Sequence, residues 1–121
     1  MPKDLKNRPI PVNAPVISEE AKRYVRDSLE TGWLSASGPY VAKFEQAFAS
    51  YLGMKHGVAV ANGTAALHSA LLALGIGPGD EVIVPAFTMI APVFAVMYTG
   101  ARPLFVDCER ETFNIDVSHI E

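Results

Sequence analysis

The chain has 121 residues and a formal net charge of −3; half of its residues are hydrophobic and 19% are charged. This balance is typical of a globular protein and excludes a disordered chain, which is poorer in apolar residues and richer in charge. The ten lysines and arginines are spread along the chain, so no nucleic-acid-binding face is expected. The single cysteine, Cys108, excludes an intrachain disulfide and fits a reducing compartment.

No segment has the pattern of a signal peptide or of a good membrane span. Residues 1–12 carry charges and prolines but no apolar core. The longest apolar stretch, residues 82–98, is interrupted by Pro85 and Pro92 and is shorter than the roughly 20 residues that a span needs. We therefore expect a cytoplasmic protein without a membrane partner.

An extended arm and two helices are predicted for the first part of the chain. Four prolines favour an extended arm over residues 1–17. Ser18 is a good N-cap for a first helix, since acidic residues follow it and suit the positive end of the helix dipole. Gly32 is expected to stop that helix. A second helix is predicted to begin at Pro39 and to end at Gly53, with apolar residues along one side.

Strands and helices alternate in the rest of the chain. Short apolar runs predict buried strands at residues 57–61, 81–84 and 102–106. Helices are predicted between them, over residues 65–74 and 89–99, and the first of these is apolar on nearly all sides and therefore expected to be buried. The order predicts an α/β protein with parallel βαβαβ units after the two preceding helices.

The first strand-to-helix turn, residues 62–65, is the candidate ligand site. Ligands of open parallel sheets bind beyond the carboxyl ends of the strands. A turn of small residues that opens a helix presents backbone N–H groups to a phosphate, and Thr64 adds a hydroxyl. Local sequence is equally compatible with Gly63 as a plain tight turn and Thr64 as a helix cap. Neither a P-loop nor a G-x-G-x-x-G pattern is present, so a generic nucleotide-binding module is disfavoured.

Several longer motifs follow one another in order: residues 32–40 (GWLSASGPY), 62–68 (NGTAALH), 75–85 (GIGPGDEVIVP), 100–107 (GARPLFVD) and 114–116 (NID). Together they resemble the DegT/DnrJ/EryC1/StrS family of nucleotide-sugar aminotransferases, which depend on pyridoxal 5′-phosphate (PLP). The resemblance covers nearly all of the chain beyond the first ten residues.

This resemblance implies the amino-terminal part of a fold-type I large domain, which residues 18–121 would contain only in part. In that topology, strands from later in the chain separate the first strand from the next two. The family also implies a small carboxyl-terminal domain and a homodimer with its active site at the subunit interface. The resemblance places the cofactor phosphate at Gly63, Thr64 and Ala65.

Two further sets of site residues follow from the resemblance. Met89 occupies the position where the family usually has an aromatic residue over the pyridine ring, and a thioether can pack there with roughly 0.3–1.5 kcal/mol. Met89 as a core methionine remains an alternative, and Phe87 is a less favoured ring partner. Ser35 and Ser37 belong to a loop, residues 35–38, that resembles a segment near the substrate in this family. His68 is interpreted as a packing residue.

No catalytic residue and no metal ligand is predicted. PLP chemistry needs a lysine that binds the cofactor covalently and a carboxylate that keeps the pyridine nitrogen protonated. In the family both lie past residue 121, so the chain is predicted to be truncated before the catalytic lysine and inactive alone. None of its five lysines matches the family motif: Lys3, Lys6, Lys22, Lys43 and Lys55.

The implied activity is transfer of an amino group, from an amino acid donor such as glutamate, to a nucleotide-linked keto sugar. One alternative is a PLP-dependent sugar dehydratase of the same family, in which histidine replaces the lysine. Another is a non-catalytic remnant or interaction module that binds no cofactor.

Overall fold

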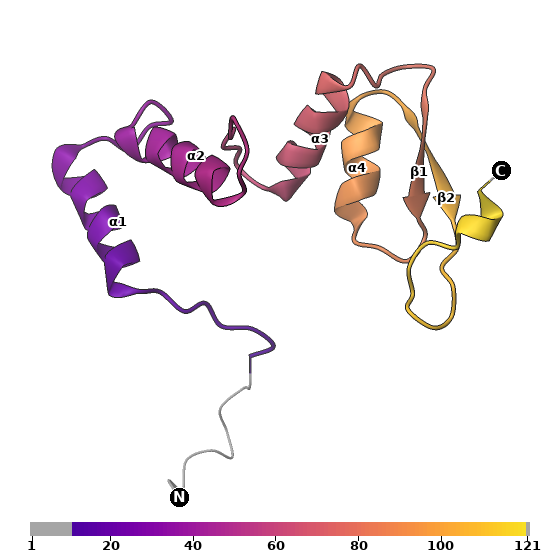
Figure 1. Cartoon of the computed structure of the whole chain (residues 1–121), viewed down its shortest axis with the longest axis horizontal. Helices are drawn as coiled ribbons and strands as arrows, with labels where there is room; N and C mark the ends of the chain where they lie inside the picture. Colours follow the sequence, from indigo (N-terminus) through magenta and orange to yellow (C-terminus); the bar gives the residue numbers. More distant parts are fainter. Residues whose placement is uncertain (1–10, 121) are drawn as a thin grey trace, which may run out of the picture. The chain divides into compact units, whose positions relative to one another are not determined.

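A computed structural model describes residues 11–120 of the chain (Figure 1). The elements fall into two compact units, which meet in sequence between Gly57 and Val58. Unit 1 contains α1 (Glu19–Thr31) and α2 (Pro39–Tyr51). Unit 2 contains α3 (Gly63–Ala73), β1 (Glu81–Pro85), α4 (Ile90–Tyr98), β2 (Arg102–Val106) and the short 3-10 helix η2 (Val117–His119). This mixture of helices and parallel strands confirms the α/β fold class.

Local capping explains where α1 begins and ends. The Ser18 hydroxyl oxygen accepts a hydrogen bond from the Ala21 backbone N–H at 3.1 Å, which satisfies one of the free donors at the helix start. At the other end Gly32 adopts φ 73°, the left-handed conformation that closes many helices. Both predicted boundaries are therefore confirmed.

Helix α2 begins at Pro39, as predicted, where the missing N–H costs nothing. It ends at Tyr51, and Gly53 follows with φ 65°. The apolar residues of α1 and α2 remain largely exposed: within the described part of unit 1, Gly38 and Ala49 alone are buried. The two helices are thus defined mainly by local signals and not by a core.

Unit 2 contains a βαβ core. Strands β1 and β2 pair in parallel, with Ile83 opposite Leu104, and α4 connects them. The buried cluster consists of Val84 of β1, Val93 and Val96 of α4, and Ala101, which directly precedes β2. Pro92 lies in the first turn of α4, where the prediction tolerated it. The second and third predicted strands and the helix between them are confirmed.

The strand predicted at residues 57–61 is wrong for this structure. The sheet of unit 2 has two strands in the order β1–β2, and residues 57–61 carry no strand assignment. An apolar run has the propensity for a strand, but it becomes one only by pairing with a neighbouring backbone. Among residues 11–120, β1 and β2 pair with each other and no further strand is present to pair with this segment.

The predicted burial of the third helix is also wrong. Helix α3 begins at Gly63, two residues before the predicted start, and no residue of it is buried. It packs against α4 on one side only, so Leu67 and Leu72 remain exposed. An apolar composition predicts a buried helix only when neighbouring elements cover every face.

Two other expectations touch the described residues. Residues 11–17 contain no helix or strand, whereas residues 1–10 of the predicted arm lie outside the described part of the chain, so the boundary at residue 17 stays a prediction. Between residues 11 and 120, no helix is both long and apolar enough to span a membrane.

Candidate functional site

The amino terminus of α3 leaves backbone donors available. Asn62 is the N-cap, and its Oδ1 accepts the Ala65 N–H at 2.9 Å. Among the described residues, none accepts a hydrogen bond from the N–H of Gly63 or Thr64, and none bonds to the Thr64 hydroxyl. The alternative that Thr64 caps the helix is therefore wrong, because Asn62 takes that role. Two N–H groups and a hydroxyl remain for an anion at the positive end of the helix dipole.

Space beside Gly63 is open. A Cβ atom placed on Gly63 would meet no other atom within 4 Å, and its φ lies outside the left-handed region. The alternative reading, that Gly63 serves only a tight turn, has no support in its backbone conformation. An unobstructed amide next to a second free amide fits the approach of a phosphate oxygen.

A cavity of about 400 Å³ lies next to this helix start and is lined by Asn62, Thr64, Ala65, His68, Phe94 and Tyr98. His68 lies one helical turn after Thr64, and its ring makes a T-shaped contact with the Tyr98 ring, with centroids 5.7 Å apart. Phe94 and Tyr98, also one turn apart, stack at 5.9 Å. His68 thus packs as predicted, and it also forms a wall of the cavity. The four-residue spacings Thr64/His68 and Phe94/Tyr98 are the pattern that sequence reasoning missed.

Met89 stands at the end of the connection from β1 to α4. It is the N-cap of α4, without a side-chain capping bond, and it is 78% exposed. The alternative of a core methionine is therefore wrong in this structure. The carboxyl end of β1 and the amino ends of α3 and α4 lie on the same side of unit 2 (Figure 1). Met89 and the α3 amino terminus therefore share the edge of the sheet at which ligands of α/β proteins bind.

Ser35 and Ser37 belong to unit 1, where they form a tight turn. The Ser35 hydroxyl oxygen accepts the Ser37 N–H at 3.3 Å, and its carbonyl accepts the Gly38 N–H at 2.9 Å. Both serines are exposed. Their role at the substrate stays a prediction.

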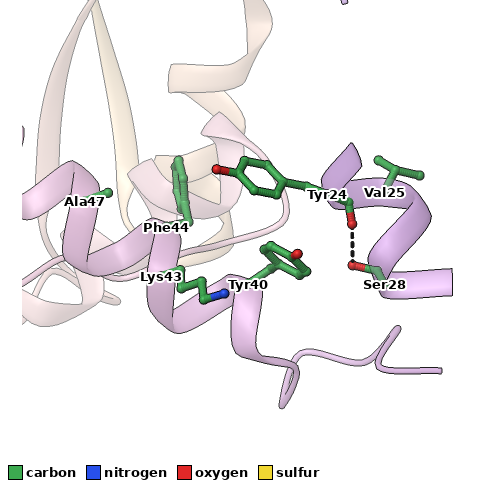
Figure 2. A pocket seen from close by; sticks show the side chains of 7 residues that line it. All are labelled: Tyr24, Val25, Ser28, Tyr40, Lys43, Phe44 and Ala47. Atoms are coloured by element: carbon green, nitrogen blue, oxygen red, sulfur yellow. Dashed lines mark hydrogen bonds between the residues drawn. The ribbon is translucent and has the colours of Figure 1, made fainter. Parts of the chain in front are cut away.

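Unit 1 has a cavity of its own, of about 500 Å³, between α1 and α2 (Figure 2). The Tyr24 and Tyr40 rings lie 5.2 Å apart there, and the Lys43 Nζ is 4.9 Å from the Tyr40 ring. The Tyr40 hydroxyl donates to the Asp27 carboxylate at 2.7 Å, and this bond raises the pKa of Tyr40 above 10.0. Most of its lining residues are aromatic or aliphatic, so its chemistry suits a phosphate less well than α3 does.

Among residues 11–120, no group of three or more histidine, cysteine or acidic side chains is arranged to hold a metal ion. The donors at α3 are amides and a hydroxyl, which suit an anion and not a cation.

The sequence profile of the DegT/DnrJ/EryC1/StrS aminotransferase family matches residues 15–121. The chain belongs to this family. Curated relatives include the GDP-perosamine synthases of Escherichia coli O157:H7 and Caulobacter vibrioides, which are 51% and 49% identical to it over 112 residues. Each of these matches covers 93% of this chain and about 30% of the relative, so the chain spans less than a third of their length.

Solved structures of the DegT family have the same fold. Spr1654 of Streptococcus pneumoniae, a proposed sugar aminotransferase, superimposes with a TM-score of 0.83 and 38% identity over 90% of this chain and 28% of its own. It has been solved in PLP, PMP and apo forms. A DegT-family aminotransferase from Brucella abortus matches with a TM-score of 0.71 and 40% identity, over 80% of this chain and 26% of its own. The prediction of PLP as the cofactor of the family is confirmed by the PLP form.

Proposed function

We propose that the protein carrying this chain is a PLP-dependent sugar aminotransferase that transfers an amino group to a nucleotide-linked keto sugar. The observation that carries the proposal is the amino terminus of α3, where the amides of Gly63 and Thr64 and the Thr64 hydroxyl are available beside open space. These donors fit a phosphate group, and the chain's family uses a phosphate-bearing cofactor.

Each residue of the site has a distinct task in this proposal. Gly63 and Thr64 bind the phosphate dianion. The dipole of α3 attracts the phosphate further, and this attraction grows as the phosphate comes closer to the helix end. Ala65, whose N–H is held by Asn62, shapes the wall of the cavity. The Met89 thioether packs against the face of the pyridine ring. PLP supplies the electron sink of the reaction when it is bound.

The names of the relatives support the proposed substrates. One relative, 38% identical over 97% of this chain, is a UDP-4-amino-4-deoxy-L-arabinose–oxoglutarate aminotransferase from Shewanella sediminis. Oxoglutarate is the keto acid that corresponds to glutamate, so we propose glutamate as the amino donor. The Ser35 and Ser37 hydroxyls would bind the sugar nucleotide, in a cytoplasmic homodimer.

The test is PLP binding by the protein that carries the chain, followed by visible absorption and by titration. Thr64→Glu places a carboxylate among the phosphate donors, and we expect at least about a hundredfold loss of PLP affinity from charge repulsion in a partly dry site. Ser69→Glu is the matched control, since it adds the same charge to an exposed position of α3 five residues farther on. PLP affinity of Thr64→Glu equal to that of the unsubstituted protein would contradict the site.

Assays with glutamate and a nucleotide-linked keto sugar separate the alternatives. Amino-group transfer supports the proposal. Loss of a sugar hydroxyl without transfer supports the dehydratase alternative instead, and absence of PLP binding supports the non-catalytic one.

A further inference from the structure

Two interactions join the connection from β1 to α4, residues 86–89, to other segments of unit 2. The Ala86 N–H donates to the Val106 carbonyl at 2.8 Å. The Phe87 ring contacts the Phe113 ring, with centroids 5.5 Å apart and planes tilted by 45°. Within the described part of the chain, these are the hydrogen bond and the ring contact that tie residues 86–88 to the rest of unit 2. The contact between the Phe87 and Phe113 rings thus joins the connection that leads to Met89 to a second segment of unit 2.

Phe113 projects from a loop, residues 107–116, that is itself closed by hydrogen bonds. Cys108 and Ile115 form an antiparallel bridge across its base. The Glu109 carboxylate accepts hydrogen bonds from the Thr112 hydroxyl and from the Thr112 N–H, the latter at 2.8 Å, which ties the turn to the base of the loop. This loop runs beside the β1–α4 connection (Figure 1).

The backbone of Phe113 is unusual. Its φ is 59°, and Phe113 is the only residue other than glycine with a positive φ in the described part of the chain. Glycine and asparagine adopt this conformation readily, whereas a bulky side chain is disfavoured there. An aromatic ring thus occupies a position that its backbone disfavours, and the Phe87 ring is the partner that it meets there.

We propose that Phe113 is a positioning residue of the cofactor site: its ring holds Phe87, and through Phe87 the β1–α4 connection, so that Met89 faces the pyridine ring. This inference rests on the proposed function, because it concerns the role of Met89 there. Phe113 acts through Phe87 and does not contact the cofactor itself.

Two substitutions separate the ring from the backbone. Phe113→Asn keeps a residue that tolerates φ 59° and removes the ring; Phe113→Tyr keeps the ring. Both are made in the protein that carries the chain. The first measurement is the NMR signal of the Met89 methyl group without cofactor, assigned with Met89→Leu, and the second is the PLP dissociation constant.

We expect Phe113→Asn to shift or broaden the Met89 methyl signal and to weaken PLP binding by about two- to tenfold, the range of an aromatic pair contact. Phe113→Tyr is expected to restore both values. The melting temperature of the cofactor-free Phe113→Asn protein should not fall, because asparagine relieves the backbone strain at this position, so a general loss of structure would be visible as a separate effect.

A double-mutant cycle with Phe87→Ala tests the coupling. If Phe113 acts through Phe87, the double variant should bind PLP no more weakly than Phe87→Ala alone. Additive losses, or an unchanged Met89 signal in Phe113→Asn, overturn the inference. Absence of PLP binding by the unsubstituted protein overturns the proposed function, whereas normal binding with no effect of Phe113→Asn overturns this inference alone.

Discussion

Unit 1 and unit 2 both contain regular α-helices, but different interactions stabilise the two units. In unit 1 the ends of α1 and α2 are set by Ser18, Gly32 and Pro39, while apolar side chains such as Val25 remain 61% exposed. In unit 2, β1 and β2 pair directly with each other, α4 connects them, and Val96 of α4 is only 2% exposed. Helix ends thus need only neighbouring residues, whereas a core needs segments that the chain brings together from a distance.

The first prediction compares a buried and an exposed valine. Val96→Asp puts a charge into the core of unit 2, and we expect the free energy of unfolding to fall by about 4 kcal/mol or more. Val25→Asp on α1 should change it by less than about 0.5 kcal/mol. Urea unfolding of the protein that carries the chain, followed by circular dichroism, measures both.

Val96→Ala serves where the aspartate variant does not fold, with an expected loss of roughly 2 kcal/mol from removed apolar contacts and the cavity that remains. A cost of Val25→Asp as large as that of Val96→Asp would break the comparison, since it would mean that the apolar side of α1 is buried against another part of the protein.

The second prediction compares two glycines. A Cβ on Gly57 would lie 2.7 Å from the Glu45 carbonyl oxygen and 3.5 Å from the Ala49 Cβ, so Gly57→Ala forces a methyl group against the backbone of α2. We expect a loss of about 1–3 kcal/mol. Gly63→Ala meets open space and places a better helix former in α3, so stability should be unchanged or slightly higher. The melting temperatures of the cofactor-free variants measure both changes in stability. Equal melting temperatures for Gly57→Ala and Gly63→Ala would contradict the close contact predicted at Gly57.

The third prediction has the smallest expected effect and concerns the pH dependence of stability. A loss is expected at high pH in unit 1 and at low pH in unit 2. In unit 1 the hydrogen bond to Asp27 raises the pKa of Tyr40 above 10.0, so its stabilisation is present below that pH and is lost as the pH rises through the folded-state value. In unit 2 hydrogen bonds, first from the Thr112 hydroxyl, lower the pKa of Glu109 below 4.5. Its stabilisation is present above pH 4.5 and is lost as the pH falls through the folded-state value.

Tyr40→Phe and Glu109→Gln test these two effects. We expect Tyr40→Phe to flatten the alkaline limb of the stability profile only, and Glu109→Gln to flatten the acidic limb only. The hydrogen bonds of both groups are exposed to solvent, so the changes in stability are small, and NMR titration of each group gives the direction of its pKa shift directly. A Tyr40 that titrates below 10.0 would show that its bond to Asp27 does not form in solution.

Sequence reasoning found most of the elements because their boundaries depend on adjacent residues. The cap at Ser18, the stop at Gly32, the start at Pro39 and the strands at 81–85 and 102–106 follow from local chemistry. The prediction of a strand at residues 57–61 failed because a strand forms only by pairing with a neighbouring strand, which other parts of a chain must supply. The prediction that α3 is buried failed because burial depends on how many sides of the helix other elements cover, and the sequence of the helix alone does not set this.

The candidate site was found in part for the same reason. Glycine and threonine at the start of a helix after an apolar run predict free donors, and the structure has them at Gly63 and Thr64. The capping by Asn62 was missed because both Asn62 and Thr64 are suitable caps, and only the backbone geometry decides between them. The wall formed by His68 and Tyr98 was missed because it joins two helices.

The sequence by itself determined the DegT family, the α/β class, the two ends of α1, the start of α2 and the turn before α3 as the candidate phosphate site. These features depend on residues within a few positions of one another or on motifs in a fixed order. The tertiary structure alone decided which apolar residues are buried, that the Phe87 ring meets Phe113, and that Met89 is exposed at the edge of the sheet. Such contacts join segments far apart in the chain, and their free energy is gained only when the fold brings those segments together.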